Sequence, residues 1–210
     1  MPRAASPQHE RLLEAAIHVF ADRGLAGATT RLVGQAAGVN GALLYYYFED
    51  KETLFVETLR RVVGGLLELL RQRRRPFRGA RERLGCLVDA VFDYYSAHPE
   101  RMRLMSVAVS LHADLLARVI RDLLRGEAPL PLALLEEGME QGTLKPVSAV
   151  QVWWNILGMC AFSLQMQGVL NHLEGPAAAR LPEAATSRQQ ILDLLVNGLA
   201  TSRSGGSRQR

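Results

Sequence analysis

The sequence has little of what a disulfide scaffold or a metal protein needs. Its 210 residues include two cysteines, Cys86 and Cys160, which lie far apart and without the paired spacing of a zinc or redox site. We expect both to be buried free thiols, the alternative being a redox switch. The five histidines, at positions 9, 18, 98, 112 and 172, show no ligand spacing. The sequence therefore predicts neither a metal nor a cofactor.

Motifs of catalysis are also missing. The chain has no Glu-x-x-His pair, no His-x-x-x-His pair and no glycine loop of the phosphate-binding type. We therefore do not expect an enzyme. A helical enzyme or small-molecule carrier that does not bind DNA remains the alternative to the function argued below.

Two segments lack features that would direct the chain to a membrane. The first residues, MPRAASPQHER, contain no apolar stretch of the signal-peptide kind, which predicts a cytoplasmic protein. Residues 149–173 contain no Asp, Glu, Lys or Arg, and are long enough to span a bilayer. Because seven other polar residues interrupt them, we expect a helix buried in protein and no membrane span.

Charge elsewhere is unevenly distributed. The chain carries a formal net charge of +4, but residues 1–51 hold five basic and five acidic side chains. If this segment binds DNA, shaped contacts must matter more than general attraction. Residues 71–78, RQRRRPFR, are strongly basic. One interpretation is a solvated helix end, and the other is a patch that binds a membrane surface or a second nucleic acid. The second interpretation is the basis of a third functional hypothesis, a membrane-associated adaptor.

Apolar residues recur with helical periodicity throughout, and we find no convincing strand pattern. The expected fold is all-α with about nine helices, at about 8–23, 30–37, 40–47, 51–74, 79–97, after 99, within 111–126, and at 131–141, 148–173 and 183–200. Residues 1–50 would form a helix-turn-helix domain, 51–76 a connecting helix, 77–200 a ligand-binding and dimerisation domain, and 201–210 a disordered basic tail.

Residues 29–48, TTRLVGQAAGVNGALLYYYF, have the pattern of a helix-turn-helix. Gly38 suits the positive φ of the turn. Leu44 and Phe48 lie four residues apart and would pack inward. Because successive helical residues point ~100° apart, the three tyrosines after Leu44 cannot all face one core. They are either ordinary amphipathic core or, in part, outward groups that donate to DNA phosphates.

The stretch RLLEAAIHVFADRGLAGATTRLVGQAAGVNGALLYYYFEDKETLFVETL closely resembles the N-terminal domain of the TetR family of bacterial transcriptional repressors. The resemblance covers roughly residues 8–60. It implies an all-α homodimer with a DNA-binding head, a linking helix, and a helical body that binds a small-molecule effector. Family members bind palindromic operators in double-stranded DNA, and usually release them when the effector binds.

Matching positions imply which residues contact DNA. Thr30 and Arg31 match backbone or base-edge contacts, while Tyr45, Tyr47 and Lys51 match phosphate contacts. The positions that match the groove-facing ones are Gly41, Ala42, Leu43 and Tyr46. Asn40, which would cap the short third helix, is also counted among the DNA-binding residues. Gly34 stands where Ala is usual, and Leu43 where Ser or Thr is frequent. A face of Gly, Ala and Leu offers almost no hydrogen-bonding code, so shape readout would count for more.

Beyond residue 60 the resemblance rests on helix order. The helices at about 148–173 and 183–200 correspond to the pair that usually builds a four-helix dimer interface. We expect a small, hydrophobic effector, neutral or else weakly acidic and met by Arg101 or Arg103. The candidate lining residues are Phe92, Tyr95, Met105, His112, Trp153 (or its neighbour Trp154), Asn155, Met159, Phe162 and Met166, with Gln165 as a further polar candidate. The alternative for each is core without a cavity.

Overall fold

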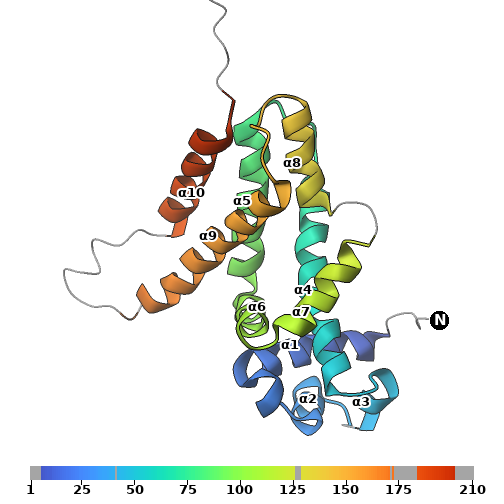
Figure 1. Ribbon diagram of the computed structural model, residues 1–210. Coiled ribbons are helices and arrows are strands. Elements are labelled where there is room, and N and C mark those ends of the chain that lie inside the picture. The colour runs from blue at the N-terminus through green and yellow to red at the C-terminus, as the bar shows by residue number, and fades with distance from the viewer. Residues whose placement is uncertain (1–5, 41, 126–128, 171, 173–183, 202–210) are drawn as a thin grey trace, which may run out of the picture. The chain divides into compact units, whose positions relative to one another are not determined.

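The computed structural model describes residues 6–40, 42–125, 129–170, 172 and 184–201, and these form ten α-helices and one isolated β-bridge, between Leu144 and Ala200 (Figure 1). The all-α expectation is confirmed, and each expected helical segment corresponds to a helix. The helices are α1 (Pro7–Gly27), α2 (Thr30–Ala37), α3 (Ala42–Tyr47), α4 (Lys51–Arg73), α5 (Ala80–Ala97), α6 (Pro99–Leu111), α7 (Ala113–Leu123), α8 (Leu130–Glu140), α9 (Ala149–Leu170) and α10 (Ala184–Leu199). Gly41 and the predicted tail beyond Thr201 lie outside the described residues.

The chain folds as two compact units. The first comprises Met1–Glu68 and Tyr95–Glu127, and the second Leu69–Tyr94 and Ala128–Arg210. Helices α4 and α5 therefore each contribute one end to each unit. Within the described residues no helix is both long and apolar enough to cross a bilayer.

The first unit is built around α1, which packs on α2 and α6. Ser6 starts α1 by accepting a hydrogen bond from the backbone N–H of His9 at 3.2 Å. Phe20 is fully buried, and its ring meets that of Phe55 edge-on with centroids 5.0 Å apart. Glu14 pairs with Arg61 and with Arg101, which ties α1 to both α4 and α6.

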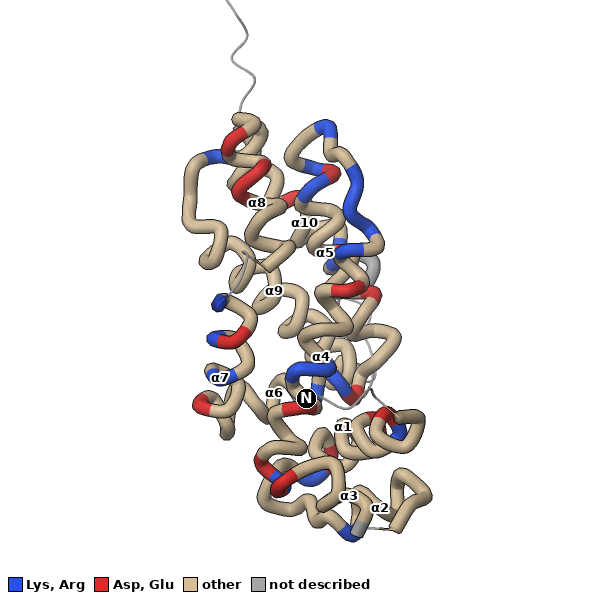
Figure 2. The backbone as a smooth tube through the Cα atoms, turned by 90° about the vertical axis from the view of Figure 1, so that its right-hand side faces the viewer, with Lys and Arg blue, Asp and Glu red and all other residues tan. Residues whose placement is uncertain are grey.

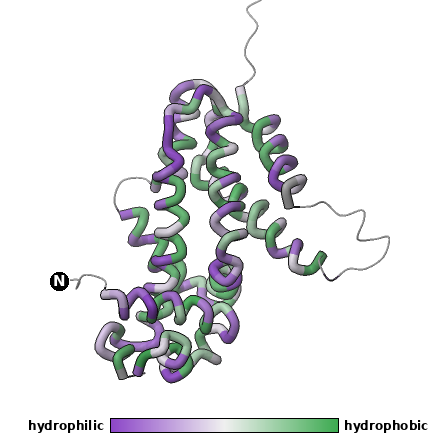
Figure 3. Tube along the Cα trace, turned by 180° about the vertical axis from the view of Figure 1, so that it is seen from behind, coloured by the Kyte–Doolittle hydropathy of each residue, from purple (hydrophilic) through white to green (hydrophobic). Residues whose placement is uncertain are grey.

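The second unit contains a helix pair, α9 and α10, that lies side by side (Figure 1). On α9 one face is buried and includes Val152, Ile156 and Cys160, while Trp154 and Phe162 are exposed. The alternation of apolar and polar residues along both helices can be followed in Figure 3. Burial raises the pKa of the Cys160 thiol to about 12, so this cysteine is an inert core residue.

Arg83 is the largest fully buried side chain of the second unit, which the sequence did not predict. It donates from Nη1 to the Leu134 carbonyl at 2.8 Å and from Nη2 to Oε1 of Gln141 at 2.7 Å. Its guanidinium also lies over the Phe77 ring, 5.3 Å from the centroid. These contacts join α5 to α8.

Candidate nucleic-acid interface

Helices α2 and α3 form the predicted helix-turn-helix. Thr29 caps α2 by accepting from the Leu32 N–H at 3.2 Å. Gly38 ends α2 in the left-handed region at φ 65°, where a side chain would be strained, and the N–H of Val39 returns to the Gly34 carbonyl at 3.0 Å. Four residues, 38–41, separate the end of α2 from the start of α3.

The inner face of the motif is apolar and closed. Val33 of α2 is 1% exposed, Leu44 of α3 is fully buried, and Phe48 is 3% exposed. The His9 ring of α1 stacks on Phe48 with centroids 5.2 Å apart. The expected inward packing of Leu44 and Phe48 is therefore what the structure has. This packing fixes which side of α3 faces outward.

The three tyrosines of α3 divide between two environments. Tyr45 and Tyr46 are 62% and 58% exposed. Tyr47 instead is half-buried, and its hydroxyl lies 2.8 Å from the Ser6 hydroxyl at the start of α1. The sequence predicts phosphate contacts for Tyr45 and Tyr47 and a groove-facing position for Tyr46. Tyr45 and Tyr46 are exposed, whereas the Tyr47 hydroxyl is engaged with Ser6. The difference arises because the N-terminus of α1 covers one flank of α3.

Groups that can meet phosphate surround the exposed tyrosines. The Tyr45 hydroxyl is 3.4 Å from Oγ1 of Thr30, the first residue of α2, and the next residue, Arg31, is exposed. Lys51 begins α4 and donates from Nζ to the Ala28 carbonyl at 3.1 Å. Before it, Asp50 caps α4 through Thr53, whose backbone and side-chain hydrogen bonds lower the pKa of the Asp50 carboxyl.

The predicted base-facing positions carry few polar groups. The Asn40 carbonyl accepts from the N–H of Leu43 at 2.9 Å, which starts α3, and Leu43 itself is half-buried. Ala42 is the first residue of α3. Figure 2 shows α2 and α3 as mostly uncharged, and Arg31 is the one charged residue of the two helices. Such a surface can contact DNA closely and read bases through apolar contacts.

Three of the predicted effector residues lie in the first unit. Tyr95 is 6% exposed, Met105 is half-buried, and His112 meets the Phe55 ring edge-on at 5.2 Å. The arginines expected to meet an acidic effector are paired instead with acids of α1. Arg101 donates to Glu14 at 3.2 Å, and Arg103 lies 3.4 Å from Asp22.

The other six lie in the second unit. Phe92 is 1% exposed, with the Arg188 guanidinium over its ring at 5.2 Å, whereas Phe162 is 67% exposed. Trp153 and Met166 are half-buried. These four side chains thus range from full burial to wide exposure.

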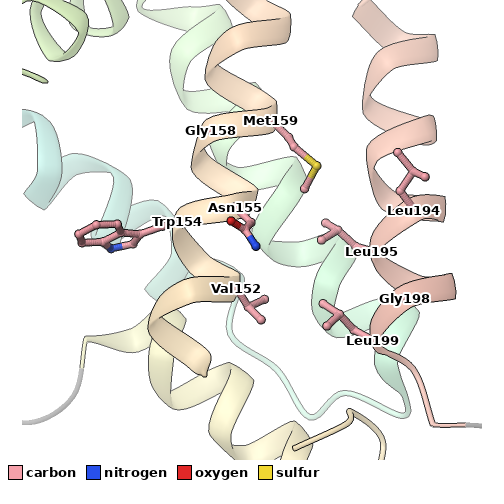
Figure 4. Close-up of a pocket in the computed structure, with 9 residues that line it drawn as sticks. All are labelled: Val152, Trp154, Asn155, Gly158, Met159, Leu194, Leu195, Gly198 and Leu199. Carbon is pink, nitrogen blue, oxygen red and sulfur yellow. The ribbon is translucent and has the colours of Figure 1, made fainter. Parts of the chain in front are cut away.

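Asn155 and Met159, the remaining two, line an open groove of about 510 Å³ between α9 and α10 (Figure 4). Leu195 and Leu199 of α10 face them across the groove. Trp154 borders the groove too, but its ring points to the opposite side of α9 in this view. Among the described residues, no cluster of three His, Cys, Asp or Glu could hold a metal.

The Ser6–Tyr47 contact was missed from the sequence because it joins residues 41 positions apart. A partial signal was present, since Ser6-Pro7 is a common helix start that places Ser6 at the cap. The buried role of Arg83 had no comparable signal, because it lies among many exposed arginines.

Comparison with known proteins gives matches over most of the chain. Residues 12–58 match the family model "Bacterial regulatory proteins, tetR family", and residues 81–195 match "Tetracyclin repressor-like, C-terminal domain". The HTH-type transcriptional repressor NicS of Pseudomonas putida is 27% identical over 199 residues, which are 93% of each chain. The HTH-type transcriptional regulator RutR of Escherichia coli is 25% identical over 174 residues, 80% of each chain.

Solved structures agree with the fold. The fatty acid degradation regulator FadR from Bacillus halodurans superposes with a TM-score of 0.71 at 22% identity, covering 99% of this chain and 100% of that one. FadR from Bacillus subtilis, solved in complex with stearoyl-CoA, gives 0.72 at 17% identity, covering 90% and 98%. With family models that match both its N-terminal segment and more than half of its length, the chain belongs to the TetR family of bacterial regulatory proteins.

Proposed function

We propose that this protein regulates transcription by binding double-stranded DNA through α2 and α3, as a homodimer that a small hydrophobic effector releases. The observation that carries the proposal is the pair of exposed rings, Tyr45 and Tyr46, on a helix whose opposite face is closed by Leu44 and Phe48. A free surface of this kind, next to the start of α2, fits a duplex groove with phosphates on both sides.

The phosphate contacts fall to Thr30, Arg31, Tyr45 and Lys51. Tyr47 acts indirectly, since its hydroxyl is engaged with Ser6 and holds α3 against α1. Lys51 also fixes the Ala28 carbonyl, so its ammonium is positioned before DNA arrives. Base contacts fall to Asn40, Gly41, Ala42, Leu43 and Tyr46, with little hydrogen-bonding capacity. Specificity would then depend strongly on the shape of the duplex.

A second copy of the chain is proposed to cover the exposed face of α9 and α10. Trp154, Phe162 and Val169 are 57%, 67% and 51% exposed and lie within ~80° of one another around α9. Leu194 of α10 is 66% exposed. A dimer would bury these side chains and present two short recognition helices to a near-palindrome, because one alone reads few base pairs.

Repression is the mode proposed here, by analogy with NicS, which is named a repressor. The apolar character of the effector is supported by the groove between α9 and α10 and by the uncharged composition of α9. FadR from Bacillus subtilis, solved with stearoyl-CoA, shows a ligand with a long apolar acyl chain in a protein of the same fold. Effector and operator must weaken each other's binding by the same factor.

The DNA contacts are tested by measuring affinity for the duplex upstream of the protein's own gene at several salt concentrations. Tyr45→Phe should weaken binding to every sequence about equally, by roughly 1 kcal/mol for one hydrogen bond. Tyr47→Phe is the matched control, and should change the stability of the head more than the DNA contact. Lys51→Ala should reduce the slope of log affinity against log salt by about one. Absence of any salt-dependent binding would favour the carrier or enzyme alternative.

The dimer is tested by light scattering on Phe162→Glu. This variant should be monomeric and should lose operator affinity. Val109→Glu, which places the same charge at a residue 61% exposed in the first unit, should stay dimeric. The effector is sought by titrating apolar compounds while following emission of Trp153 and Trp154, the two tryptophans of the chain. Emission should change as DNA is released, and a change without release would refute the coupling.

A further inference from the structure

A second groove in the second unit is rich in arginine. It measures about 510 Å³ and is bordered by the last turn of α4, the segment that follows it, the first turns of α5, and α10. Figure 2 shows the basic run along this part of the backbone. The lining residues are Gln72, Arg73, Arg74, Arg75, Arg81, Glu82, Gly85, Cys86, Asp89 and Leu192. Four arginines thus face two acids in one concave surface.

Three of these arginines are held in place by carboxylates outside the lining. The pairs are Arg73 with Asp93 at 2.9 Å, Arg74 with Glu137 at 2.7 Å, and Arg81 with Asp193 at 2.6 Å. Each pair distance refers to one terminal nitrogen, whereas a guanidinium has five N–H donors. The ion pairs therefore orient the three groups and leave further donors for another acceptor. Such preorganisation lowers the entropy lost on binding.

Arg75 differs from the other three. It is exposed, and no carboxylate in the described part of the chain lies within ion-pair distance of its side chain. Its charge still acts on the groove lining: burial raises the pKa of the Cys86 thiol, and the charges of Arg73 and Arg75 offset part of that rise. Among the described residues, Arg75 thus supplies a positive charge that is not held in an ion pair.

This geometry argues against the broader interpretations of residues 71–78. A membrane surface or a second duplex site needs arginines free to reach a large anionic surface. Here Arg73 and Arg74 are paired within the unit, and Arg73 is only 33% exposed. The concave groove, which Gly85 and Leu192 also line, admits a small molecule. The planar guanidinium of arginine presents two parallel N–H donors that match the oxygens of a carboxylate or a phosphate.

We propose that this arginine groove binds a small organic phosphate, with Arg75 as its principal charged contact. Arg73, Arg74 and Arg81 supply oriented N–H donors, and Glu82 and Asp89 exclude ligands that lack enough negative charge to compensate for them. The proposal does not depend on the DNA-binding function, because the groove uses none of the residues assigned to DNA.

Cys86 provides a reporter within the groove. The chain has two cysteines, of which Cys160 is fully buried with a pKa of about 12. Cys86 is half-buried and lines the groove. A maleimide applied to the native protein should therefore react at Cys86, and Cys86→Ala should abolish the reaction. An anion seated in the groove should slow this reaction.

The experiment measures the rate of Cys86 alkylation against inorganic pyrophosphate, with chloride adjusted to hold the ionic strength constant. Pyrophosphate should protect the thiol in a saturable manner. Arg75→Ala should raise the half-protecting concentration about tenfold, the loss expected for a charge-assisted hydrogen bond. Arg78→Ala is the matched control, since Arg78 is also exposed but does not line the groove. It should shift that concentration less than about twofold.

Three results would overturn the proposal. The first is protection that follows ionic strength whatever the anion. The second is an equal shift in the Arg75→Ala and Arg78→Ala variants, which would indicate general charge attraction. The third is protection by a short duplex without an operator but not by pyrophosphate, which would assign the groove to the DNA backbone.

Discussion

Replacing Arg83 by methionine should destabilise the second unit by about 3 kcal/mol, because it removes a buried cation and leaves its acceptors unpaired. Arg83 is 1% exposed and donates at 2.8 Å to Leu134 and at 2.7 Å to Gln141, with Glu137 at 3.4 Å. Methionine replaces the aliphatic stem of Arg83 but ends before the guanidinium, so the contact with the Phe77 ring is lost as well.

The magnitude follows from the fate of each partner. Two hydrogen bonds from a charged donor contribute about 1.5–3 kcal/mol each. Burial of the guanidinium opposes folding by several kcal/mol, and methionine relieves that penalty. Glu137 keeps a 35% exposed side chain and can be hydrated, but the Leu134 carbonyl lies inside the unit. The net loss in the free energy of unfolding should therefore be about 3 kcal/mol, the lower end of the range for removing one partner of a buried ion pair.

Urea denaturation at one protein concentration measures the effect, with Arg81→Met as the control. Arg81 carries the same charge and an ion pair to Asp193 at 2.6 Å, but its side chain is 55% exposed. Exposed pairs contribute about 0–1 kcal/mol, so the control should lose less than about 1 kcal/mol. If Arg83→Met loses no more than the control, the buried contacts do not stabilise the unit and the reasoning fails. Gln141→Ala combined with Arg83→Met should be non-additive, since the two side chains share one bond.

Further predictions concern single positions. Gly138→Ala should destabilise the protein, because a Cβ there would lie 2.7 Å from Leu144 Cδ1 and 2.9 Å from Arg83 Cδ. Gly64→Ala, where a Cβ meets open space, should stabilise it by about 0.5–1 kcal/mol. Thermal melts of both variants test this, and shifts of the melting temperature in the same direction would contradict it. With a chromogenic thiol reagent at pH 8, at most Cys86 should titrate before unfolding and both thiols afterwards. Burial raises the pKa of Asp93, but hydrogen bonds from Arg188 and Arg73 outweigh it, so its folded pKa lies below the unfolded value of about 3.9. The stability that Asp93 contributes is thus full above about pH 4–5 and is lost as the pH falls through the folded pKa. Asp93→Asn should therefore make unfolding, measured by circular dichroism, depend less steeply on pH in the acid range. An unchanged pH profile would contradict the assignment.

Local signals predicted the helices well, and contacts between distant residues less well. Gly38, the Thr29–Thr30 start and the Leu44–Phe48 spacing are all read within one or two turns, so the helix-turn-helix could be placed from sequence. The inward turn of Tyr47 depends on Ser6, and periodicity within α3 carries no information about what α1 covers. In the body, the buried Arg83 resembles its exposed neighbours in sequence, because the difference lies in the α8 carbonyl it meets. Candidate effector residues were chosen by type, and type alone does not separate the buried Phe92 from the exposed Phe162.

The hydrogen bond between Ser6 and Tyr47 has a practical consequence for anyone who purifies this protein. Through this bond Ser6 holds α3, so an affinity tag fused shortly before Ser6 would join the chain close to a group that fixes the proposed DNA-facing surface. A tag that pulls Ser6 away would free the Tyr47 hydroxyl and loosen α3, and the measured operator affinity would then report the tag as well as the protein. A tag placed beyond the end of α10 at Leu199 is far from Ser6 in sequence and is the better choice.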